Sequence, residues 1–363
     1  MKEKKRVAII GTNGIPAKYG GFETLSEFLV ENLNEQFDFV VFCSKTQKKS
    51  QNNLKSYKGA KLIYLPFNAN GYQSILYDAI SILISLFKYN TLLVLGASGS
   101  FSFFLNTFFK KNIILNHGGL NEWERDKYGK IGKFWALYSR KIATKFTTND
   151  IGDNPLIIDS LKKTFGVEAK LISYGGDHVF DVKTDDSLLI KYPFVKDEYY
   201  VSVSRAQSDN NIHLLINTFE FLPDKILVII SNWQVSEYGK NIWEEFKDKF
   251  ENIILLDAVY DKKELNYLRS KSLAYIHSHS FCGTAPSLVE AMALELPIIS
   301  FDVPTNRYTT DNKAVYFKTE EDLKNTINSL NHQLLANNKK EMFQLSQERY
   351  TWKHIAELYA EIF

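Results

Sequence analysis

Residues 281–307 read FCGTAPSLVEAMALELPIISFDVPTNR and decide the fold that we predict for this chain. An apolar run at residues 273–277 precedes the segment, and a second run, residues 297–301, lies inside it. Both runs are typical of buried parallel strands. Between them, a small glycine-containing turn leads into a helix, for which Thr284 is the expected N-cap and Pro286 falls in the first turn.

This strand, loop and helix combine a predicted anion site with a carboxylate. The unpaired N–H groups and the dipole of a helix N-terminus attract anions. Glu290 lies about a turn and a half beyond Thr284. Its carboxylate repels phosphate, but it can accept hydrogen bonds from sugar hydroxyls. The pattern therefore predicts a nucleotide that carries both diphosphate and ribose. An ordinary turn with a solvated glutamate is the alternative that the loop alone leaves open.

Composition narrows the class of protein. The chain has 363 residues, 45% of them hydrophobic and 24% charged, which is typical of a soluble protein with two domains. A net charge of +2 argues against a nucleic-acid-binding protein. Cys43 and Cys282 lie far apart, which predicts neither a disulfide framework nor a zinc motif and fits a reducing cytosol. We expect no signal peptide and no membrane-spanning helix.

Apolar runs alternate with helical patterns along the whole chain. This alternation predicts open parallel sheets with helices on both faces, and ligands at the carboxyl ends of the strands. A charged segment without periodicity, residues 181–198, is the expected linker. The predicted strands are residues 6–10, 37–43, 61–65, 91–95, 112–115 and 170–173 before the linker, and residues 199–204, 226–231, 253–256, 273–277 and 297–301 after it.

Two separated motifs carry a resemblance to a known family. One is the segment GTAPSLVEAMA with the later Asp302 and Asn306-Arg307, and the other is IGTNGIPAKYGGFETL near the amino terminus. Together they resemble family 4 glycosyltransferases, and more narrowly the bacterial rhamnosyltransferase-like branch that builds capsule, O-antigen and cell-wall polysaccharides. The resemblance implies the GT-B architecture, two Rossmann-like domains facing across a cleft. We expect domains at residues 1–182 and 183–345, and a last helix at 346–363 that packs back on the first domain.

The resemblance also implies which residues bind the donor. Glu290 would hold the ribose, and the loop before it would hold sugar and diphosphate. Arg205 matches a diphosphate-binding arginine, whereas Asn210 stands where lysine is common, and Cys282 replaces a frequent glutamate. Tyr260 would lie near the base, or would simply be a core residue. The predicted donor-binding residues are Gly20, Gly21, Arg205, Asn210, Tyr260, Cys282, Gly283, Thr284, Ser287 and Glu290.

His117 and Arg125 are the expected acceptor contacts. His117 follows a strand and precedes two glycines, close to where related enzymes have a His or an Asp. We therefore expect His117 to take part in catalysis with Arg205 and Glu290, and a structural histidine is the alternative. A metal is not expected, because His277 and His279 at alternate positions of a strand would point to opposite sides.

A basic amphipathic helix is expected at residues 124–146, next to an aromatic run at 101–109. Such a surface can lie on anionic membranes, and a solvated face or a plain core is the alternative for each segment taken alone. Together, the resemblance and these segments predict a cytoplasmic glycosyltransferase that is peripheral on the inner face of the plasma membrane. It would move L-rhamnose from dTDP-L-rhamnose to an undecaprenyl-diphosphate-linked saccharide, with retention and without cofactor or metal. The alternatives are a UDP- or GDP-sugar donor, a nucleotide-sugar epimerase and a non-catalytic sugar-nucleotide-binding subunit.

Overall fold

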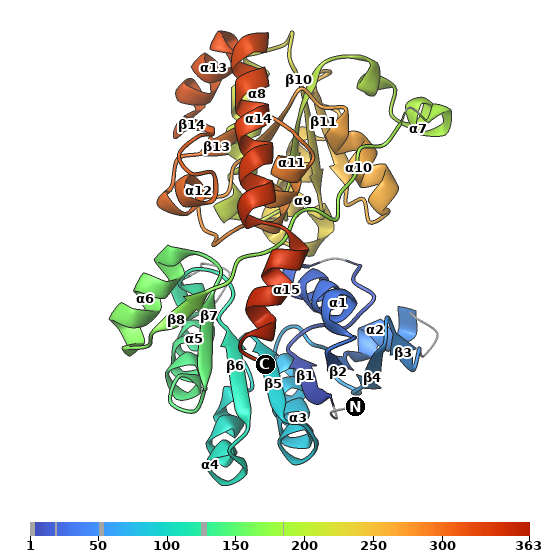
Figure 1. Ribbon diagram of the computed structural model, residues 1–363. Helices are drawn as coiled ribbons and strands as arrows, with labels where there is room; N and C mark the ends of the chain where they lie inside the picture. Colours follow the sequence, from blue (N-terminus) through green and yellow to red (C-terminus); the bar gives the residue numbers. More distant parts are fainter. Residues whose placement is uncertain (1–3, 19, 51–53, 125–128, 184) are drawn as a thin grey trace. The chain divides into compact units, whose positions relative to one another are not determined.

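The computed structural model describes residues 4–18, 20–50, 54–124, 129–183 and 185–363. Contacts divide the chain into two compact units (Figure 1). Unit 1 comprises Met1–Tyr174 and Trp352–Phe363, and unit 2 comprises Gly175–Thr351. The boundaries between the units therefore lie after residues 174 and 351, whereas we expected them after residues 182 and 345.

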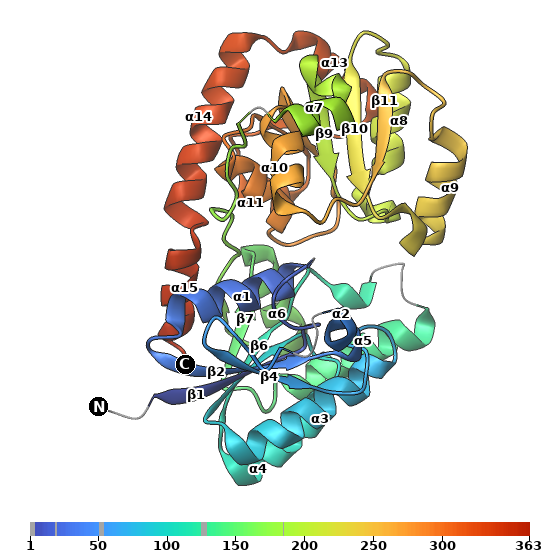
Figure 2. The ribbon, with the colours of Figure 1, turned by 90° about the vertical axis from the view of Figure 1, so that its right-hand side faces the viewer.

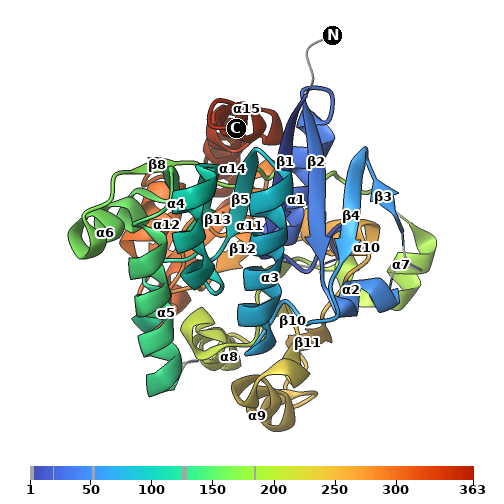
Figure 3. The same cartoon turned by 90° about the horizontal axis from the view of Figure 1, so that it is seen from below.

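Unit 1 is built on an eight-stranded sheet with the order β3-β4-β2-β1-β5-β6-β7-β8. Every neighbouring pair is parallel except β3 with β4. Figure 3 shows β3 and β4 at one edge and β8 at the other. The strands are β1 (Lys5–Ile10), β2 (Phe37–Cys43), β3 (Ser56–Tyr57), β4 (Ala60–Tyr64), β5 (Thr91–Leu95), β6 (Asn112–Asn116), β7 (Asn149–Gly152) and β8 (Ala169–Leu171).

Helices cover both faces of this sheet. One apolar core joins alternate strand residues to α3, η1 and α5, and Figure 2 shows α1 and α15 on the opposite face. Trp352 of α15 stacks on Phe28 of α1, with ring centroids 4.7 Å apart. The helices are α1 (Gly21–Leu33), α2 (Lys45–Ser50), α3 (Gln73–Lys88), η1 (Ser100–Leu105), α4 (Asn106–Phe109), η2 (Glu122–Glu124), α5 (Lys130–Ala143), α6 (Pro155–Phe165) and α15 (Trp352–Ala360).

Unit 2 is built on a six-stranded, fully parallel sheet with the order β11-β10-β9-β12-β13-β14. Counted within the unit, this is the 3-2-1-4-5-6 order of a Rossmann domain, in which the order reverses between the first and fourth strands. These two strands are β9 and β12. The strands are β9 (Tyr199–Val203), β10 (Ile226–Ser231), β11 (Ile253–Asp257), β12 (Ala274–His277), β13 (Ile298–Phe301) and β14 (Val315–Phe317).

The helices of unit 2 also lie on both faces of their sheet. A core of alternate strand residues packs on α8, α9 and α13, and Figure 2 shows α10, α11 and α14 on the other side of the strands. The helices are α7 (Asp186–Lys191), η3 (Pro193–Lys196), η4 (Ser208–Asn210), α8 (Ile212–Glu220), η5 (Trp233–Val235), α9 (Glu237–Phe246), α10 (Lys262–Ser270), α11 (Pro286–Ala293), α12 (Pro304–Thr309), α13 (Glu320–Ser329) and α14 (His332–Arg349).

Every strand predicted from the sequence is present, within one or two residues at its ends. The short strands β3, β7 and β14 were not predicted. β3 and β14 have two and three residues, and β7 reads NDIG, so none of the three contains an apolar run of four residues. The expected linker at residues 181–198 contains α7, which begins after Asp185. The Asp185 side chain accepts hydrogen bonds from two N–H groups of the first turn. This N-cap stabilises a short helix that the periodicity of the sequence did not indicate.

Candidate functional site

Hydrogen bonds join the loop after β9 to the loop after β12. Asn211 donates from Nδ2 to the Ser278 carbonyl at 2.9 Å, and the main-chain N–H of Ser280 donates to the Asp209 carbonyl at 2.9 Å. Ser278 donates in turn from Oγ to the Asn210 carbonyl. The reversal of strand order also falls between these strands. The two loops therefore form one surface at the carboxyl edge of the sheet, where open parallel sheets bind ligands.

Arg205 supplies the positive charge of this surface. It follows β9 and is exposed, and its guanidinium has no hydrogen bond or ion pair with any residue that the structure describes. Asn210 is buried and donates from Nδ2 to the Arg205 carbonyl at 2.7 Å. The Asn210 amide thus fixes the main chain of Arg205, and the Arg205 guanidinium stays available to an anion.

The helix that follows the second loop begins later than predicted. The N-cap of α11 is Ala285, not Thr284, and no side chain caps the helix. Pro286 occupies the first turn, as expected. Thr284 is buried, as is Gly283 before it, and Ser287 is half-buried. The prediction of Thr284 as a cap was wrong because one more residue of the loop stays extended before the helix.

Glu290 lies between two side chains that bear hydrogen-bond donors. Arg269 of α10, only 3% exposed, lies with Nη1 2.6 Å from Oε2 of Glu290. His178 lies with Nε2 3.4 Å from Oε1. The chain reaches this position by passing close over α11, since a Cβ on Gly176 would lie 2.5 Å from the Val289 carbonyl oxygen. Both oxygens of the Glu290 carboxylate are therefore oriented by neighbouring side chains.

Glu290 is held in its charged form. Burial raises the pKa of a carboxyl group, but the charge of Arg269 and the hydrogen bonds of His178 and Arg269 outweigh burial and lower the pKa of Glu290 to about 2. The sequence did not indicate these two partners. His178 stands in the segment that ends the first sheet region, and Arg269 lies in a polar helix, so neither has a local signal that links it to Glu290.

His277 and His279 lie together, contrary to the sequence argument against a metal. β12 ends at His277, so the alternation of a strand no longer applies at His279, and the two ring centroids are 4.2 Å apart. One potential ligand atom from each of His277, His279 and Cys282 lies within 4.8 Å of the others. Cys282 donates from Sγ to Asn306 Oδ1 at 3.4 Å.

The remaining predicted donor residues lie elsewhere. Tyr260 is 56% exposed in the loop after β11, at the edge of the sheet and two strands away from β9. Gly20 and Gly21 belong to unit 1, where Gly20 is the N-cap of α1 with a φ of 117°. A side chain at Gly20 would be strained and would overlap Glu23, because its Cβ would lie 2.1 Å from Oε2.

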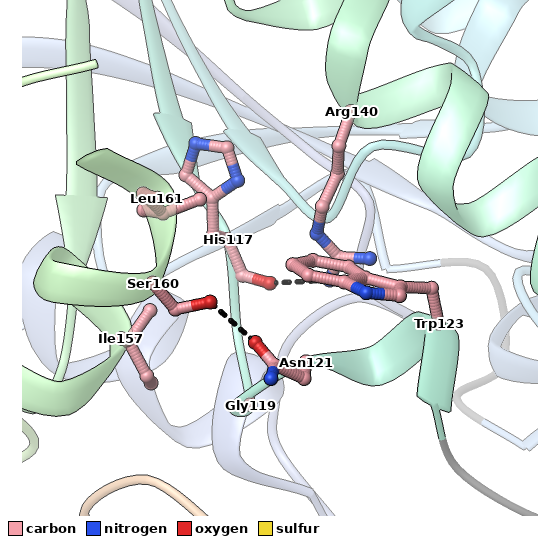
Figure 4. Close-up of a pocket in the computed structure, with 8 residues that line it drawn as sticks. All are labelled: His117, Gly119, Asn121, Trp123, Arg140, Ile157, Ser160 and Leu161. Atoms are coloured by element: carbon pink, nitrogen blue, oxygen red, sulfur yellow. Dashed lines mark hydrogen bonds between the residues drawn. The ribbon is translucent and has the colours of Figure 1, made fainter. Parts of the chain in front are cut away.

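His117 is buried inside unit 1. Its Nε2 lies 2.7 Å from Oδ1 of Asp150, its main-chain carbonyl accepts from Nη2 of Arg140 at 2.8 Å, and it is 1% exposed. In Figure 4 its ring points away from Asn121. Both residues line a cavity of about 10 Å³, which is no larger than a water molecule. Burial lowers the pKa of His117, and its hydrogen bond to the Asp150 carboxylate opposes this shift only in part.

The second predicted acceptor residue, Arg125, lies outside the described residues. Arg140 was expected on the basic face of the helix at residues 124–146. It is instead 6% exposed, and its guanidinium lies 5.4 Å from the centre of the Trp123 ring. The helix itself is shorter than predicted, since α5 spans Lys130–Ala143.

Two family models match the chain. Residues 4–177 match a domain of unknown function, DUF1972, and residues 189–345 match the glycosyl transferases group 1 model. The chain is also similar to the O-antigen chain mannosyltransferase RfbU of Salmonella typhimurium, with 22% identity over 196 residues. That match covers 53% of this chain and 53% of the relative, so the chain spans about half the length of the curated relative it matches.

Solved structures show the same fold over the whole chain. Sucrose-phosphate synthase from Thermosynechococcus elongatus has a TM-score of 0.84 at 15% identity, covering 99% of this chain and 98% of that chain. HepE from Anabaena in complex with UDP has a TM-score of 0.70 at 12% identity, covering 98% of each chain. A glycosyltransferase from Rickettsia africae has a TM-score of 0.76 at 13% identity, covering 100% of this chain and 98% of that chain.

These likenesses confirm the predicted α/β fold with two Rossmann-like domains. The site described above, from Arg205 to Glu290, lies entirely within the segment that matches the second family model. Residues 189–345, which contain the site, are thus the part of this chain that is similar to glycosyl transferases group 1.

Proposed function

We propose that this protein transfers a sugar from a nucleoside diphosphate donor to a saccharide hydroxyl, and that unit 2 holds the donor. The observation that carries the proposal is that a cationic and an anionic side chain, not paired with each other, stand on neighbouring segments at the carboxyl edge of one sheet. The guanidinium of Arg205, which has no partner among the described residues, stands in a loop that is hydrogen-bonded to the loop before α11. Helix α11 carries the carboxylate of Glu290, which Arg269 and His178 hold in place. A donor nucleotide needs one group for its diphosphate and another for its ribose.

Each residue has a role in this proposal. Arg205 binds the diphosphate with its charged, forked guanidinium, and the N–H groups at the start of α11 add to this attraction. Glu290 accepts hydrogen bonds from the ribose hydroxyls, because a carboxylate has about four lone-pair sites and its two neighbours occupy only part of them. Arg269 and His178 are positioning residues that hold this carboxylate charged and oriented.

The reaction that we propose needs no added metal. The bond between the anomeric carbon and the donor β-phosphate breaks, and the acceptor oxygen forms a new bond to that carbon. The acceptor proton passes to the departing phosphate, on the same face if the configuration is retained. Arg205 and the start of α11 stabilise the negative charge that develops on the leaving group. Full transfer in the presence of EDTA is the expected result.

The family resemblance supports a choice of donor and acceptor, and the curated relative supports a role in O-antigen assembly. We propose dTDP-L-rhamnose as donor and an undecaprenyl-diphosphate-linked saccharide as acceptor, in the assembly of an O-antigen or similar surface polysaccharide. RfbU is named a mannosyltransferase and HepE was solved with UDP, so GDP-mannose and UDP-glucose are the donors to compare. Free nucleoside diphosphate that appears only when acceptor is present would separate this transferase from an epimerase.

Unit 1 carries a surface that suits a lipid-linked acceptor. Ser100 of η1 donates from Oγ to the Ser139 carbonyl of α5, and the rings of Phe101 and Trp135 lie 6.3 Å apart, so the two elements form one continuous surface. Lys110, Lys130 and Lys141 are exposed on the same elements or next to them. We call this surface the aromatic patch, and its exposed apolar residues are Phe101, Phe104, Phe108, Ile131, Phe134, Leu137 and Tyr138.

We propose that the aromatic patch rests on the cytoplasmic face of the plasma membrane. Aromatic and aliphatic side chains enter the headgroup region, and lysines are attracted to anionic lipids. Within the described residues, no helix is long and apolar enough to cross a membrane. A peripheral contact would bring the chain to an acceptor whose lipid part stays in the bilayer.

Arg205→Ala and Glu290→Gln are each expected to lower the rate of acceptor-dependent nucleoside diphosphate release at least about 100-fold, because each removes a contact to the donor. Lys240→Ala, which removes an exposed charge on α9, is the control. Circular dichroism should show that all three variants fold. Near-normal release by a folded Arg205→Ala variant would exclude the proposed role of this residue.

The charge of Glu290 gives a pH-dependent stability. Its pKa falls from 4.5 to about 2 on folding, so its contribution is fully present above pH 4.5 and is lost as the pH falls towards 2. In urea denaturation, the difference in unfolding free energy between the wild type and Glu290→Gln should shrink by about 2 kcal/mol from pH 6 to pH 3. An exposed carboxylate of α9, tested as Glu244→Gln, is the control, and the same pH dependence in both variants would contradict the ion pair.

Membrane binding is tested with vesicles that contain phosphatidylglycerol. The wild type should sediment with them at low salt, and the double variant Ile131→Glu/Phe134→Glu should bind at least about 10-fold more weakly because it places two charges in the apolar surface. Phe221→Glu/Val235→Glu changes two equally exposed apolar residues of unit 2 and is the control. Equal losses in both double variants would rule out the aromatic patch as the binding surface.

A further inference from the structure

The cluster of His277, His279 and Cys282 has the composition of a transition-metal site. His277 ends β12, and the other two residues lie in the loop between β12 and α11. One ligand atom from each residue lies within 4.8 Å of the other two. Two imidazoles and one thiol are ligands for borderline metal ions such as Zn²⁺, and they do not suit Mg²⁺ or Ca²⁺.

His277 is the member of this cluster that the fold leaves unsatisfied. It is 1% exposed, and neither of its ring nitrogens has a hydrogen-bond partner among the described residues. A buried imidazole has a donor and an acceptor, and leaving both without a partner costs free energy. The ring lies beside the ring of His279, with centroids 4.2 Å apart, and no hydrogen bond to a described residue fixes the tautomer of His277. A metal ion would use one of these nitrogens as a ligand.

Asn306 holds the other side of the cluster in place. Its Nδ2 donates to the carbonyls of His279 and Phe301, at 2.9 and 3.0 Å, so its Oδ1 is oriented. That oxygen lies 3.4 Å from Sγ of Cys282. In a tetrahedral zinc site, neighbouring ligand atoms are about 3.3 to 3.6 Å apart, given bond lengths of about 2.0 to 2.3 Å. The histidine and cysteine ligand atoms lie within 4.8 Å of one another, and side-chain rotations that move them by about an ångström would bring them to this spacing.

We propose that His277, His279 and Cys282 bind one Zn²⁺ ion, with the fourth position left to Asn306 Oδ1 or a water molecule. The ion would bind the thiolate of Cys282 and one nitrogen of each histidine, and the thiol proton would leave to solvent. Binding joins the end of β12 to the loop before α11, and so stabilises unit 2. The ion takes no part in the sugar transfer proposed above, so neither proposal rests on the other.

Cobalt absorption tests the ligands directly. Co²⁺ bound to a thiolate gives a near-ultraviolet charge-transfer band, and tetrahedral Co²⁺ gives visible bands. The chain has two cysteines, so only Cys43 and Cys282 are candidates for the thiolate. Cys43 is buried in unit 1, and burial raises its pKa to about 12. The charge-transfer band should appear with one equivalent of Co²⁺, persist in Cys43→Ser, and disappear in Cys282→Ser.

Thermal denaturation tests the effect on stability. Zn²⁺ at about 100 times its dissociation constant should stabilise the wild type by about 2.7 kcal/mol, seen as a higher melting temperature of the purified, EDTA-treated protein. His279→Ala should abolish this shift, whereas His332→Ala, at an exposed position of α14, should keep it. His277→Ala is not needed, because that buried ring affects folding by itself. No charge-transfer band with Co²⁺, or an equal zinc shift in His279→Ala, would overturn the proposal.

Discussion

The order of the strands in unit 2 is the constraint on which the site depends. β9 and β12 are neighbours in the sheet, and the chain leaves them towards opposite sides because the strand order reverses there. Two loops that are far apart in the sequence become neighbours at the carboxyl edge of the sheet, and a hydrogen bond from Asn211 to the Ser278 carbonyl joins them. In open parallel sheets, the connections on either side of such a reversal run to opposite faces and leave a crevice for a ligand between them.

The site then keeps one charge free and one charge paired. Arg205 has no partner among the described residues and is exposed, so an anion from solution meets little competition for it. Glu290 is the reverse case, since Arg269 compensates for its partial burial and keeps it ionised. Because the guanidinium partner of Glu290 is Arg269, the charges of Arg205 and Glu290 do not neutralise each other. This separation of charge is what a diphosphate with an attached ribose requires.

Sequence patterns were sufficient for the α/β fold and for most strands of the two sheets. Long apolar strands such as β5 and β10 were predicted at their observed bounds, because the buried strands of parallel sheets are continuous apolar runs. The partners of Glu290 were not predicted, since Arg269 and His178 reach it only through tertiary packing over Gly176. The proximity of His277 to His279 was missed for a local reason, because β12 ends at His277 and the alternation of a strand does not extend to His279, two residues later.

Nucleotide-sugar binding to the purified protein tests the central claim most directly. A thermal-shift series would compare dTDP-L-rhamnose, UDP-glucose and GDP-mannose, with NAD as control, in the wild type and in Arg205→Ala. A ligand that binds the folded state raises the melting temperature according to its concentration relative to its dissociation constant. We expect dTDP-L-rhamnose to raise the melting temperature of the wild type and to have little effect on the variant. No shift with any sugar nucleotide, or an equal shift in the variant, would contradict a donor site at Arg205 and Glu290.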